Sequence, residues 1–274
     1  MSRSREGRGA GLTRKLMYKR WYQALAEITH DKHYWTFMNY GYLDPEAPVL
    51  ELDAQDELRR HQVQLYRHLL EPVEVEGRDL LEVGSGRGGG AEHVARCLAP
   101  ASYTGLDYSE NAIDLCNSIH QRDNLRFVHG DAEMIPFADD SFDVVLSVEA
   151  THCFASNVRF LTGAHRVLRP GGRLLLTDFR DAPEADDLRA DIEAAGFEIE
   201  SERDITAEVV FALDADVERK KAFTEQEVPE GLRAQFATFA ALENAAAELR
   251  DDGTFGFASG ILSHAALNDT MSDE

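Results

Sequence analysis

The chain has 274 residues, of which 43% are hydrophobic and 28% charged, values typical of a globular protein with one large domain or two small ones. A net charge of −22 argues against nucleic-acid binding, because phosphates would be repelled. Cys97, Cys116 and Cys153 lack the paired spacing of a metal site, and no apolar run reaches membrane-spanning length, so we expect a cytoplasmic protein without a metal.

Residues 1–52 are predicted to form a segment separate from the main domain. The first 26 residues contain seven basic residues and one acid, Glu6, and they begin with a Ser/Arg/Gly-rich stretch typical of disorder. From Leu12 onward, apolar residues recur at helical spacing beside the basic ones, which predicts an amphipathic helix. This helix either docks on an anionic membrane face or packs on its own domain as part of a lid, and we favour the lid.

The end of this segment, residues 33–44, is rich in aromatic side chains. Rings at this density either fold over a ligand or close one end of the sheet. We favour ligand contact, and the expected substrate-binding residues are Trp35, Phe37, Tyr40, Tyr42 and, further along the chain, Phe154. Residues 53–71 then predict the helix that precedes the sheet and begins the main domain, 53–264.

The stretch 79–90, DLLEVGSGRGGG, combines a short apolar strand with a cluster of glycines, and an apolar helical pattern follows it at 91–98. Strand, glycine turn and helix form the cofactor-binding corner of doubly wound α/β sheets. Glycines let the backbone approach a ligand closely, and the helix N-terminus offers free N–H groups. The same pattern suits a dinucleotide, but Glu82 favours a cationic ligand, because a carboxylate repels a pyrophosphate.

Two further acids end the next two predicted strands, 101–107 and 125–131. Asp107 follows Glu82 by 25 residues, close to the spacing at which an acid meets ribose hydroxyls in doubly wound cofactor-binding folds. Asp131 follows Asp107 by a further 24 residues. A single acid at a turn is usually only solvated, whereas three at successive strand ends indicate a binding site.

The alternation of strands and helices continues through the rest of the chain. Ser109 is the predicted N-cap of a helix over 111–120. The further predicted elements are strand 142–148, helix 158–168 ending at a 169–172 turn, strand 173–179, helix 184–195, strand 196–200, a helical insertion over 207–250 interrupted near 229–231, strand 254–262 and a disordered acidic tail, 265–274. This order predicts an α/β fold.

These motifs, in this order and spacing, resemble the class I S-adenosylmethionine-dependent methyltransferases. The residues that carry the resemblance are Glu82–Gly90, 103–107, 129–133, 149–154 and 167–172. More narrowly, the chain resembles the phthiotriol/phenolphthiotriol dimycocerosates methyltransferases and related fatty-acid and polyketide O-methyltransferases at residues 39–42, 88–90, 100–107 and 148–153.

The resemblance implies a doubly wound, seven-stranded, mostly parallel sheet of Rossmann-like type, with an N-terminal helical lid and a helical insertion before the last strand. It implies S-adenosyl-L-methionine as the cofactor. The cofactor-binding residues expected from the matching positions are Glu82, Gly84, Ser85, Gly86, Gly88, Asp107, Tyr108, Asp131, Ala132 and Glu149. The implied activity is O-methylation of a hydroxyl on a hydrophobic lipid or polyketide-type natural product, so a hydrophobic small molecule is the expected partner.

Methyl transfer from a sulfonium is an in-line displacement at an activated carbon, so the protein mainly orients the nucleophile. A neutral alcohol gains from a base that takes its proton as the bond forms, and imidazole suits that role near neutral pH. His152 follows the fourth strand, where class I enzymes present the substrate, and it is the predicted catalytic base. Asp178, at the end of the fifth strand, is predicted to orient His152.

Other functions stay open at the level of the sequence. A dehydrogenase shares the glycine pattern, although Glu82, Asp131 and the seven strands argue against it. A protein of methyltransferase fold can also bind the cofactor and catalyse a cyclisation or rearrangement, or methylate carbon, nitrogen or a carboxyl group. The sequence determines neither the acceptor molecule nor the oligomeric state.

Overall fold

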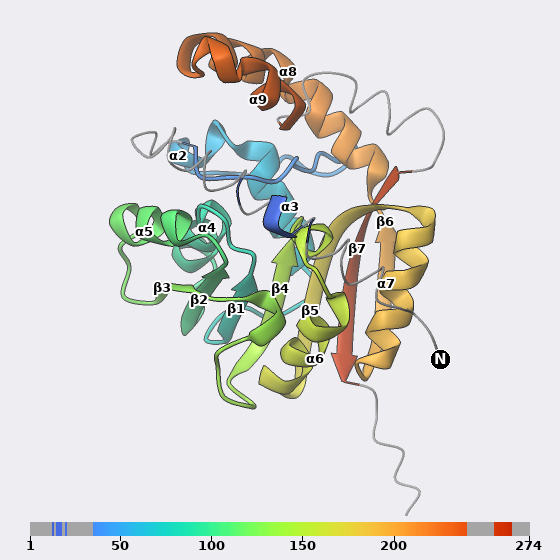
Figure 1. Ribbon diagram of the computed structural model, residues 1–274. Helices are drawn as coiled ribbons and strands as arrows, with labels where there is room; N and C mark the ends of the chain where they lie inside the picture. Colours follow the sequence, from blue (N-terminus) through green and yellow to red (C-terminus); the bar gives the residue numbers. More distant parts are fainter. Residues whose placement is uncertain (1–12, 14, 18–19, 21–34, 240–254, 265–274) are drawn as a thin grey trace, which may run out of the picture.

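The structure, a computed structural model, describes residues 13, 15–17, 20, 35–239 and 255–264 (Figure 1). Its centre is a seven-stranded sheet with the strand order β3-β2-β1-β4-β5-β7-β6. The strands are β1 (Asp79–Val83), β2 (Ser102–Asp107), β3 (Leu125–His129), β4 (Phe142–Val148), β5 (Leu168–Asp181), β6 (Phe197–Asp204) and β7 (Phe255–His264). Neighbouring strands run parallel except at β7, which is antiparallel to both β5 and β6. The predicted fold class is confirmed.

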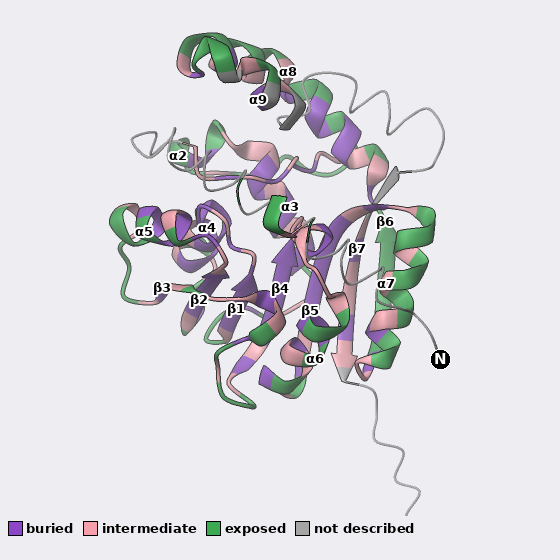
Figure 2. Cartoon of the chain, in the orientation of Figure 1, coloured by how far each residue is buried: buried purple, intermediate pink, exposed green. Residues whose placement is uncertain are grey.

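Helices cover both faces of the sheet, so that the central strands are buried (Figure 2). One face carries α3 (Arg60–Leu70), α4 (Gly89–Cys97) and α5 (Glu110–Ile119), and the other carries α6 (Asn157–Val167) and α7 (Ala182–Ala194). Side chains alternate between the two resulting cores: Leu175 of β5 packs in the first, and Leu174 and Leu176 pack in the second. Burial on both faces explains the continuous apolar runs that mark these strands in the sequence.

The order of the strands reverses at β1 and β4. The chain runs outward from β1 to β2 and β3, and then returns to the opposite side of β1 to form β4. Ligands of open α/β sheets bind outside the carboxyl ends of the strands at such a point. The described part of the predicted insertion comprises α8 (Thr206–Glu227), η3 (Glu230–Leu232) and α9 (Arg233–Phe239), here called the cap helices, which lie over this end of the sheet (Figure 1).

Some elements differ from their sequence predictions. The predicted turn at 169–172 lies inside β5, where Gly171 has φ = +79° and the pairing with β4 shifts register, so the glycines form an irregularity within one strand. The predicted helix 53–71 is two helices, α2 (Ala54–Glu57) and α3, because Arg59 between them has φ = −129° and ψ = 27°.

Several predictions cannot be compared with the structure. Most of the predicted N-terminal helix, the second part of the insertion and the acidic tail lie outside the described residues. Within the part of the chain that is described, no helix is long and apolar enough to cross a membrane.

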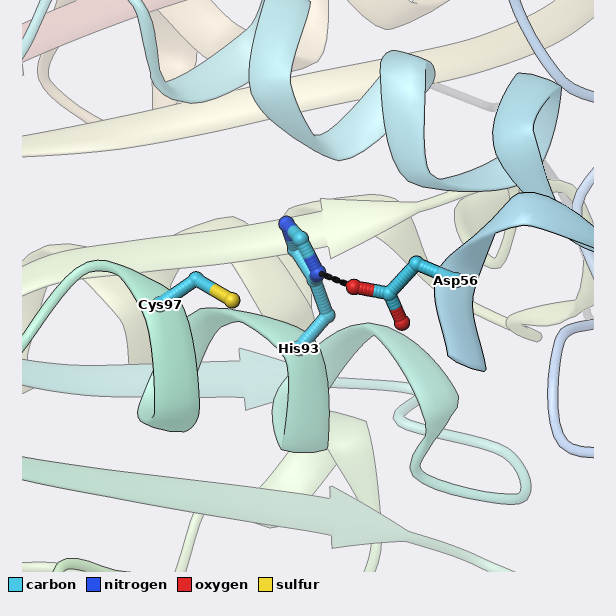
Figure 3. Close-up of side chains that lie close together, drawn as sticks. All are labelled: Asp56, His93 and Cys97. Carbon is cyan, nitrogen blue, oxygen red and sulfur yellow. Dashed lines mark hydrogen bonds and ion pairs between the residues drawn. The ribbon is translucent and has the colours of Figure 1, made fainter. Parts of the chain in front are cut away.

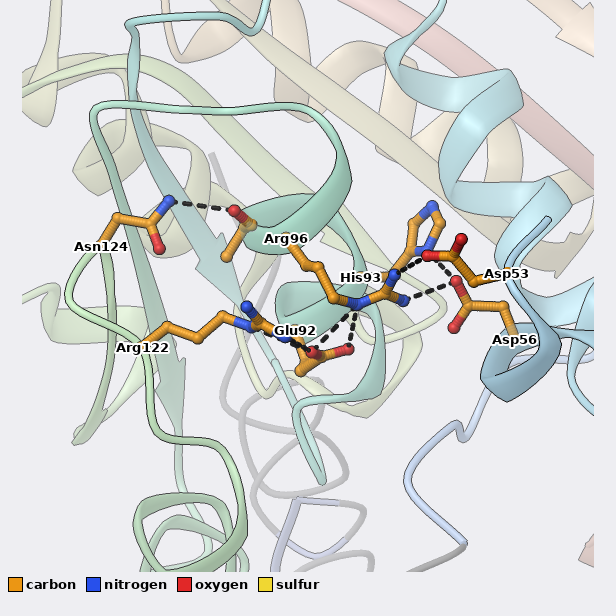
Figure 4. Close-up of polar contacts among 8 residues, drawn as sticks. Asp53, Asp56, Glu92, His93, Arg96, Arg122 and Asn124 are labelled. Carbon is orange, nitrogen blue, oxygen red and sulfur yellow. Dashed lines mark hydrogen bonds and ion pairs between the residues drawn. The ribbon is translucent and has the colours of Figure 1, made fainter. Parts of the chain in front are cut away.

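A hydrogen bond and an ion pair of Asp56 join α2 to α4. Asp56 Oδ2 accepts from His93 Nδ1 at 2.9 Å (Figure 3) and from the Arg96 guanidinium at 2.6 Å (Figure 4). Arg96 also pairs with Glu92 at 3.2 Å, and Glu92 pairs with Arg122 at 2.6 Å. The two contacts of Asp56 fix the segment that precedes the sheet against the helix that follows the glycine turn, and Glu92 links that helix to the loop after α5.

Candidate functional site

A cavity, here called the strand-end cavity, opens at the carboxyl ends of β1, β2 and β4. Its wall contains seven of the ten residues predicted to bind the cofactor, namely Gly84, Gly86, Asp107, Tyr108, Asp131, Ala132 and Glu149. Phe154, predicted to contact substrate, lies in the same wall. The fold therefore brings these residues together from four separate stretches of the sequence.

The glycine turn after β1 forms one side of the strand-end cavity. Gly84 has φ = +83°, and a Cβ there would lie 2.4 Å from Cβ of Ala150. Gly86 has φ = +54°, and its N–H donates to Asp107 Oδ2 at 2.8 Å, while Asp107 Oδ1 accepts from the Ser109 N–H at 2.8 Å. Such φ angles favour glycine, and at Gly84 the neighbouring Ala150 also leaves no room for a side chain. Asp107 holds the turn against the end of β2.

Glu82 is placed differently from its prediction, because it does not lie in the cavity wall. Its side chain is fully buried near the end of β1, where it accepts from the hydroxyls of Tyr66 at 2.6 Å and Tyr103 at 2.9 Å. Burial raises the pKa of Glu82 to about 7 in spite of these hydrogen bonds. Ser85 and Gly88, also predicted to contact the cofactor, lie outside the wall as well. Sequence spacing identifies the turn but not which of its side chains face the cavity.

Glu149 lies in the wall at the end of β4 in an unusual backbone conformation, with φ = +48°. Its carboxyl accepts from the Tyr40 N–H at 3.0 Å, and burial raises its pKa to about 8. A non-glycine residue in this region of φ is uncommon and is often found at functional sites. Glu149 thus connects the strand-end cavity to the aromatic segment around Tyr40.

Lys15, which the sequence reasoning did not single out, occupies the end of the cavity beyond β3. Its Nζ donates to Asp131 at 2.8 Å and to Glu133 at 2.6 Å, and it lies 4.8 Å from the centre of the Tyr108 ring. Burial opposes the charge, but the two carboxylates outweigh it and raise the pKa of Lys15. This part of the cavity therefore binds a positively charged amine beside an aromatic ring. No local motif could reveal a pair 116 residues apart.

The two predicted catalytic residues are paired. Asp178 Oδ1 accepts from His152 Nδ1 at 2.7 Å, and Asp178 Oδ2 accepts from the His152 backbone N–H at 2.8 Å. The Thr151 hydroxyl also donates to Asp178, and it accepts from Arg180 at 2.6 Å. Thr151 and Arg180 were missed in the sequence, although Arg180 lies two residues from Asp178 and so on the same face of β5.

The electrostatics of this pair follow from burial and charge. Burial favours the neutral carboxyl, but the charge and hydrogen bond of His152 outweigh it and lower the pKa of Asp178 to about 2. Burial likewise opposes the imidazolium, but Asp178 outweighs it and raises the pKa of His152 to about 10. Because Asp178 is ionised, His152 Nδ1 donates to it, and Nε2 is the ring nitrogen that can exchange a proton with a ligand.

His152 lies next to both the strand-end cavity and the aromatic segment. Its chain neighbours Ala150 and Cys153 line the cavity. Its ring packs on Phe179 with 4.3 Å between ring centres, and Phe179 packs on Tyr40 at 5.7 Å. The His152 imidazole is therefore held in place by its packing on Phe179 and by its hydrogen bond to Asp178.

A second cavity, here called the cap cavity, lies between residues 35–40, the α2–α3 junction and the cap helices. It has a volume of about 480 Å³, and its wall includes three of the predicted substrate residues, Trp35, Phe37 and Tyr40. Tyr42 is not among them: its ring stacks on His68 at 4.3 Å and lines a separate cavity. Besides its aromatic residues, this wall contains three basic side chains, Arg59, Arg219 and Lys220, which the sequence did not indicate.

One cluster outside these cavities has metal-ligand residue types. Asp56, His93 and Cys97 each place one potential ligand atom within 4.8 Å of the others (Figure 3). The Asp56 oxygen that would bind a cation already accepts from the Arg96 guanidinium at 2.6 Å. We therefore assign the cluster a structural role between α2 and α4.

The strand-end cavity fits the cofactor that the sequence motifs imply. Asp107, Asp131 and Glu149 present three carboxyl groups to it. S-adenosylmethionine carries an ammonium, a sulfonium, an adenine amine and ribose hydroxyls, all of which are cations or hydrogen-bond donors. The Lys15 ammonium on Asp131 occupies the position of such a donor.

Comparison with known proteins agrees with this site. Residues 81–176 match the family model described as a methyltransferase domain. The chain is 40% identical over 220 residues, 80% of each protein, to phthiotriol/phenolphthiotriol dimycocerosates methyltransferase 1 of Mycobacterium ulcerans. It is 39% identical over 221 residues, again 80% of each, to the fatty-acid O-methyltransferase of Mycolicibacterium smegmatis.

Among solved structures, the cyclase SpnF has a similar fold, with a TM-score of 0.70 and 21% identity over 90% of this chain and 95% of that one. The predicted cofactor, S-adenosylmethionine, is confirmed by the family. The chain belongs to the S-adenosylmethionine-dependent methyltransferases, in the group that contains the phthiotriol/phenolphthiotriol dimycocerosates methyltransferases.

Proposed function

We propose that this methyltransferase methylates a hydroxyl of a hydrophobic lipid or polyketide-type molecule, with His152 accepting the hydroxyl proton. The observation that carries the proposal is the buried His152–Asp178 pair beside the strand-end cavity. The aromatic wall of the cap cavity suits an apolar substrate. Two relatives are named for a phthiotriol-type lipid and for fatty acids, which supports a substrate of this class.

The cofactor is proposed to lie in the strand-end cavity, held by the backbone of the glycine turn. Asp107 would accept from the ribose hydroxyls, and Asp131 would accept from the adenine amine in place of Lys15. When bound, the cofactor supplies a methyl group on a sulfonium, a carbon that is already reactive toward an oxygen nucleophile. The remaining task of the protein is to orient the acceptor and to remove its proton.

His152 performs the proton transfer in this proposal. Asp178 fixes the imidazole through Nδ1, which leaves Nε2 to take the proton. With its pKa raised to about 10, His152 is mostly protonated near neutral pH in the absence of a ligand. A positive charge bound nearby lowers the pKa of a histidine, so the cationic cofactor favours the neutral base.

The test uses the purified protein with S-adenosylmethionine and a panel of long-chain alcohols and hydroxy acids. Release of S-adenosylhomocysteine should depend on an acceptor hydroxyl, and the product should be a methyl ether. His152→Ala should lower turnover by about 10²–10⁴ while the affinity for S-adenosylhomocysteine stays unchanged. His165→Ala is the matched control, because His165 packs on Phe197 away from both cavities.

Two results would contradict the proposal in different ways. Full activity in His152→Ala would show that the protein acts by positioning alone. Conversion of a substrate without release of S-adenosylhomocysteine would indicate a cyclisation or rearrangement.

A further inference from the structure

The cap cavity has a charge that differs from the rest of the chain. Its wall contains three basic residues and one acid, Glu227, in a protein that has 28 basic and 50 acidic residues overall. Exposed surfaces of an acidic protein carry mostly carboxylates, so three cations around one cavity point to an anionic ligand.

The buried carboxylate of Asp216 neutralises one of these three cations, Arg219. Its carboxylate pairs with the Arg219 guanidinium through both oxygens and accepts from Gln62 at 3.3 Å. Arg219 is therefore held at the edge of the cavity by a partner on its own helix.

Arg59 lies near the carboxylate of Asp56 but does not form a close ion pair with it. Among the described residues, no carboxylate lies within 4.0 Å of its guanidinium, although the side chain is partly buried in the cavity wall. Burial and the neighbouring Arg219 lower the pKa of Arg59, and they outweigh the more distant carboxylate of Asp56, which raises it. The charge is therefore held at a cost that a bound anion would offset. Lys220 follows Arg219 in α8 and places its amino group in the wall of the same cavity. Burial lowers the pKa of Lys220.

Apolar rings complete the cavity. Trp35 packs edge-on against Phe236 at 4.6 Å and lies 5.9 Å from Phe223, so one wall is a cluster of three aromatic side chains. A cavity with cations on one side and rings on another suits an amphiphile, whose chain contacts the rings while its head meets the charges.

We propose that the cap cavity binds the substrate of the proposed methyl transfer through an anionic head, a carboxylate or a phosphate, held by Arg59 and Lys220. This inference rests on the proposed function, because it takes the bound ligand to be the substrate of the methyl transfer. The head is an anchor and not the methyl acceptor. The acceptor hydroxyl lies further along the chain, toward Tyr40, whose ring leads through Phe179 to His152.

The experiment measures binding to the full-length protein, with S-adenosylhomocysteine present, by calorimetry. Three amphiphiles of equal chain length serve as probes: laurate, lauryl phosphate and lauryl alcohol. Arg59→Gln and Lys220→Gln should each weaken binding of an anionic probe by roughly 10- to 100-fold and leave lauryl alcohol unchanged. Whichever of laurate and lauryl phosphate shows the larger loss identifies the head. Arg59→Lys, which keeps the charge, should retain most of the affinity.

Lys221→Gln is the matched control, since Lys221 has the same charge, is the next residue in α8, and pairs with Glu218 at the surface. Equal losses for the anionic probes and the alcohol, or an equal loss in Lys221→Gln, would overturn the proposal. A parallel reaction contains S-adenosylmethionine in place of S-adenosylhomocysteine. Formation of methyl laurate in that reaction would also overturn the proposal, because the anion would then be the acceptor. Anion binding through Arg59, together with no methylation of a long-chain hydroxy acid when S-adenosylmethionine is supplied, would contradict the proposed function alone.

Discussion

Replacing Asp178 with Asn tests the electrostatics of the catalytic pair. The amide keeps the shape of the carboxylate but removes the charge that raises the pKa of His152 to about 10. Without that charge, burial should bring the pKa to about 6.5 or below, a fall of at least ~3.5 units, or ~5 kcal/mol in the preference for the imidazolium. The variant also removes one of the two carboxylates near Arg180, which lies 3.6 Å from Asp178 and 3.9 Å from Glu184.

The pH–rate profile should report this change. In the natural protein, turnover should rise with pH across the neutral and alkaline range, because only the neutral imidazole accepts a proton. The bound cationic cofactor should place this rise below the pKa of about 10 that His152 has without a ligand. In Asp178→Asn the profile should be flat above about pH 6.5, at a lower plateau, because a less basic and less well oriented imidazole is a weaker catalyst. The deficit of the variant should therefore grow with pH.

Folding stability offers an independent readout of the same pair. A histidine whose folded pKa is raised stabilises the fold fully below its unfolded pKa of about 6.5, and this contribution is lost as pH rises through 10. Denaturant unfolding should show the largest difference between the natural protein and Asp178→Asn near pH 6, and a smaller one near pH 10. Asp186→Asn, at an exposed position, is the control. A deficit in turnover and stability that is the same at every pH would refute the reasoning.

Three further predictions concern the strand-end cavity. Asp107→Ala should weaken binding of S-adenosylhomocysteine by roughly 1.5–3 kcal/mol in a calorimetric titration, and unchanged affinity would exclude the proposed contact with the ribose. Lys15→Gln should tighten cofactor binding severalfold, because Lys15 then no longer competes for Asp131; weaker binding would mean that Lys15 contacts the cofactor itself. Gly84→Ala should destabilise the fold by ~1–3 kcal/mol in denaturant unfolding, because its φ is +83° and the new methyl would lie 2.4 Å from Ala150; a stability like that of the natural protein would contradict this.

Local sequence patterns determine much of this fold. Strand β4 occupies the predicted residues 142–148, and Ser109 caps α5 by accepting from the Ala112 N–H, as its side chain suggests. Both features depend on neighbouring residues only. The prediction of a turn at 169–172 was wrong. Gly171 bends the chain both where an element ends and where a strand becomes irregular, and only the pairing of β5 with β4 shows that the strand continues.

The site was predictable where a side chain lies on the same strand end as its motif, as for Asp107, Asp131 and the His152–Asp178 pair. The position of a side chain was not predictable where it depends on residues far away in the sequence. Glu82 is buried because Tyr66 and Tyr103 enclose it.

The positive charge of the cap cavity could not be predicted from the sequence either. Arg59 and Lys220 lie 161 positions apart, in a helix predicted before the sheet and in a helical insertion of mixed polar and apolar residues. Only the packing of the cap helices over the α2–α3 junction places both cations in one cavity.

The most direct test of the central claim is to locate the transferred methyl group. The protein is incubated with S-adenosylmethionine labelled with ¹³C in the methyl group and with a long-chain hydroxy acid, and the product is analysed by NMR. The account predicts a labelled methyl ether on the hydroxyl oxygen in the natural protein and in His165→Ala, with at most about one hundredth of that rate in His152→Ala. A label on carbon, on nitrogen or on the carboxylate, or an undiminished rate in His152→Ala, would contradict it.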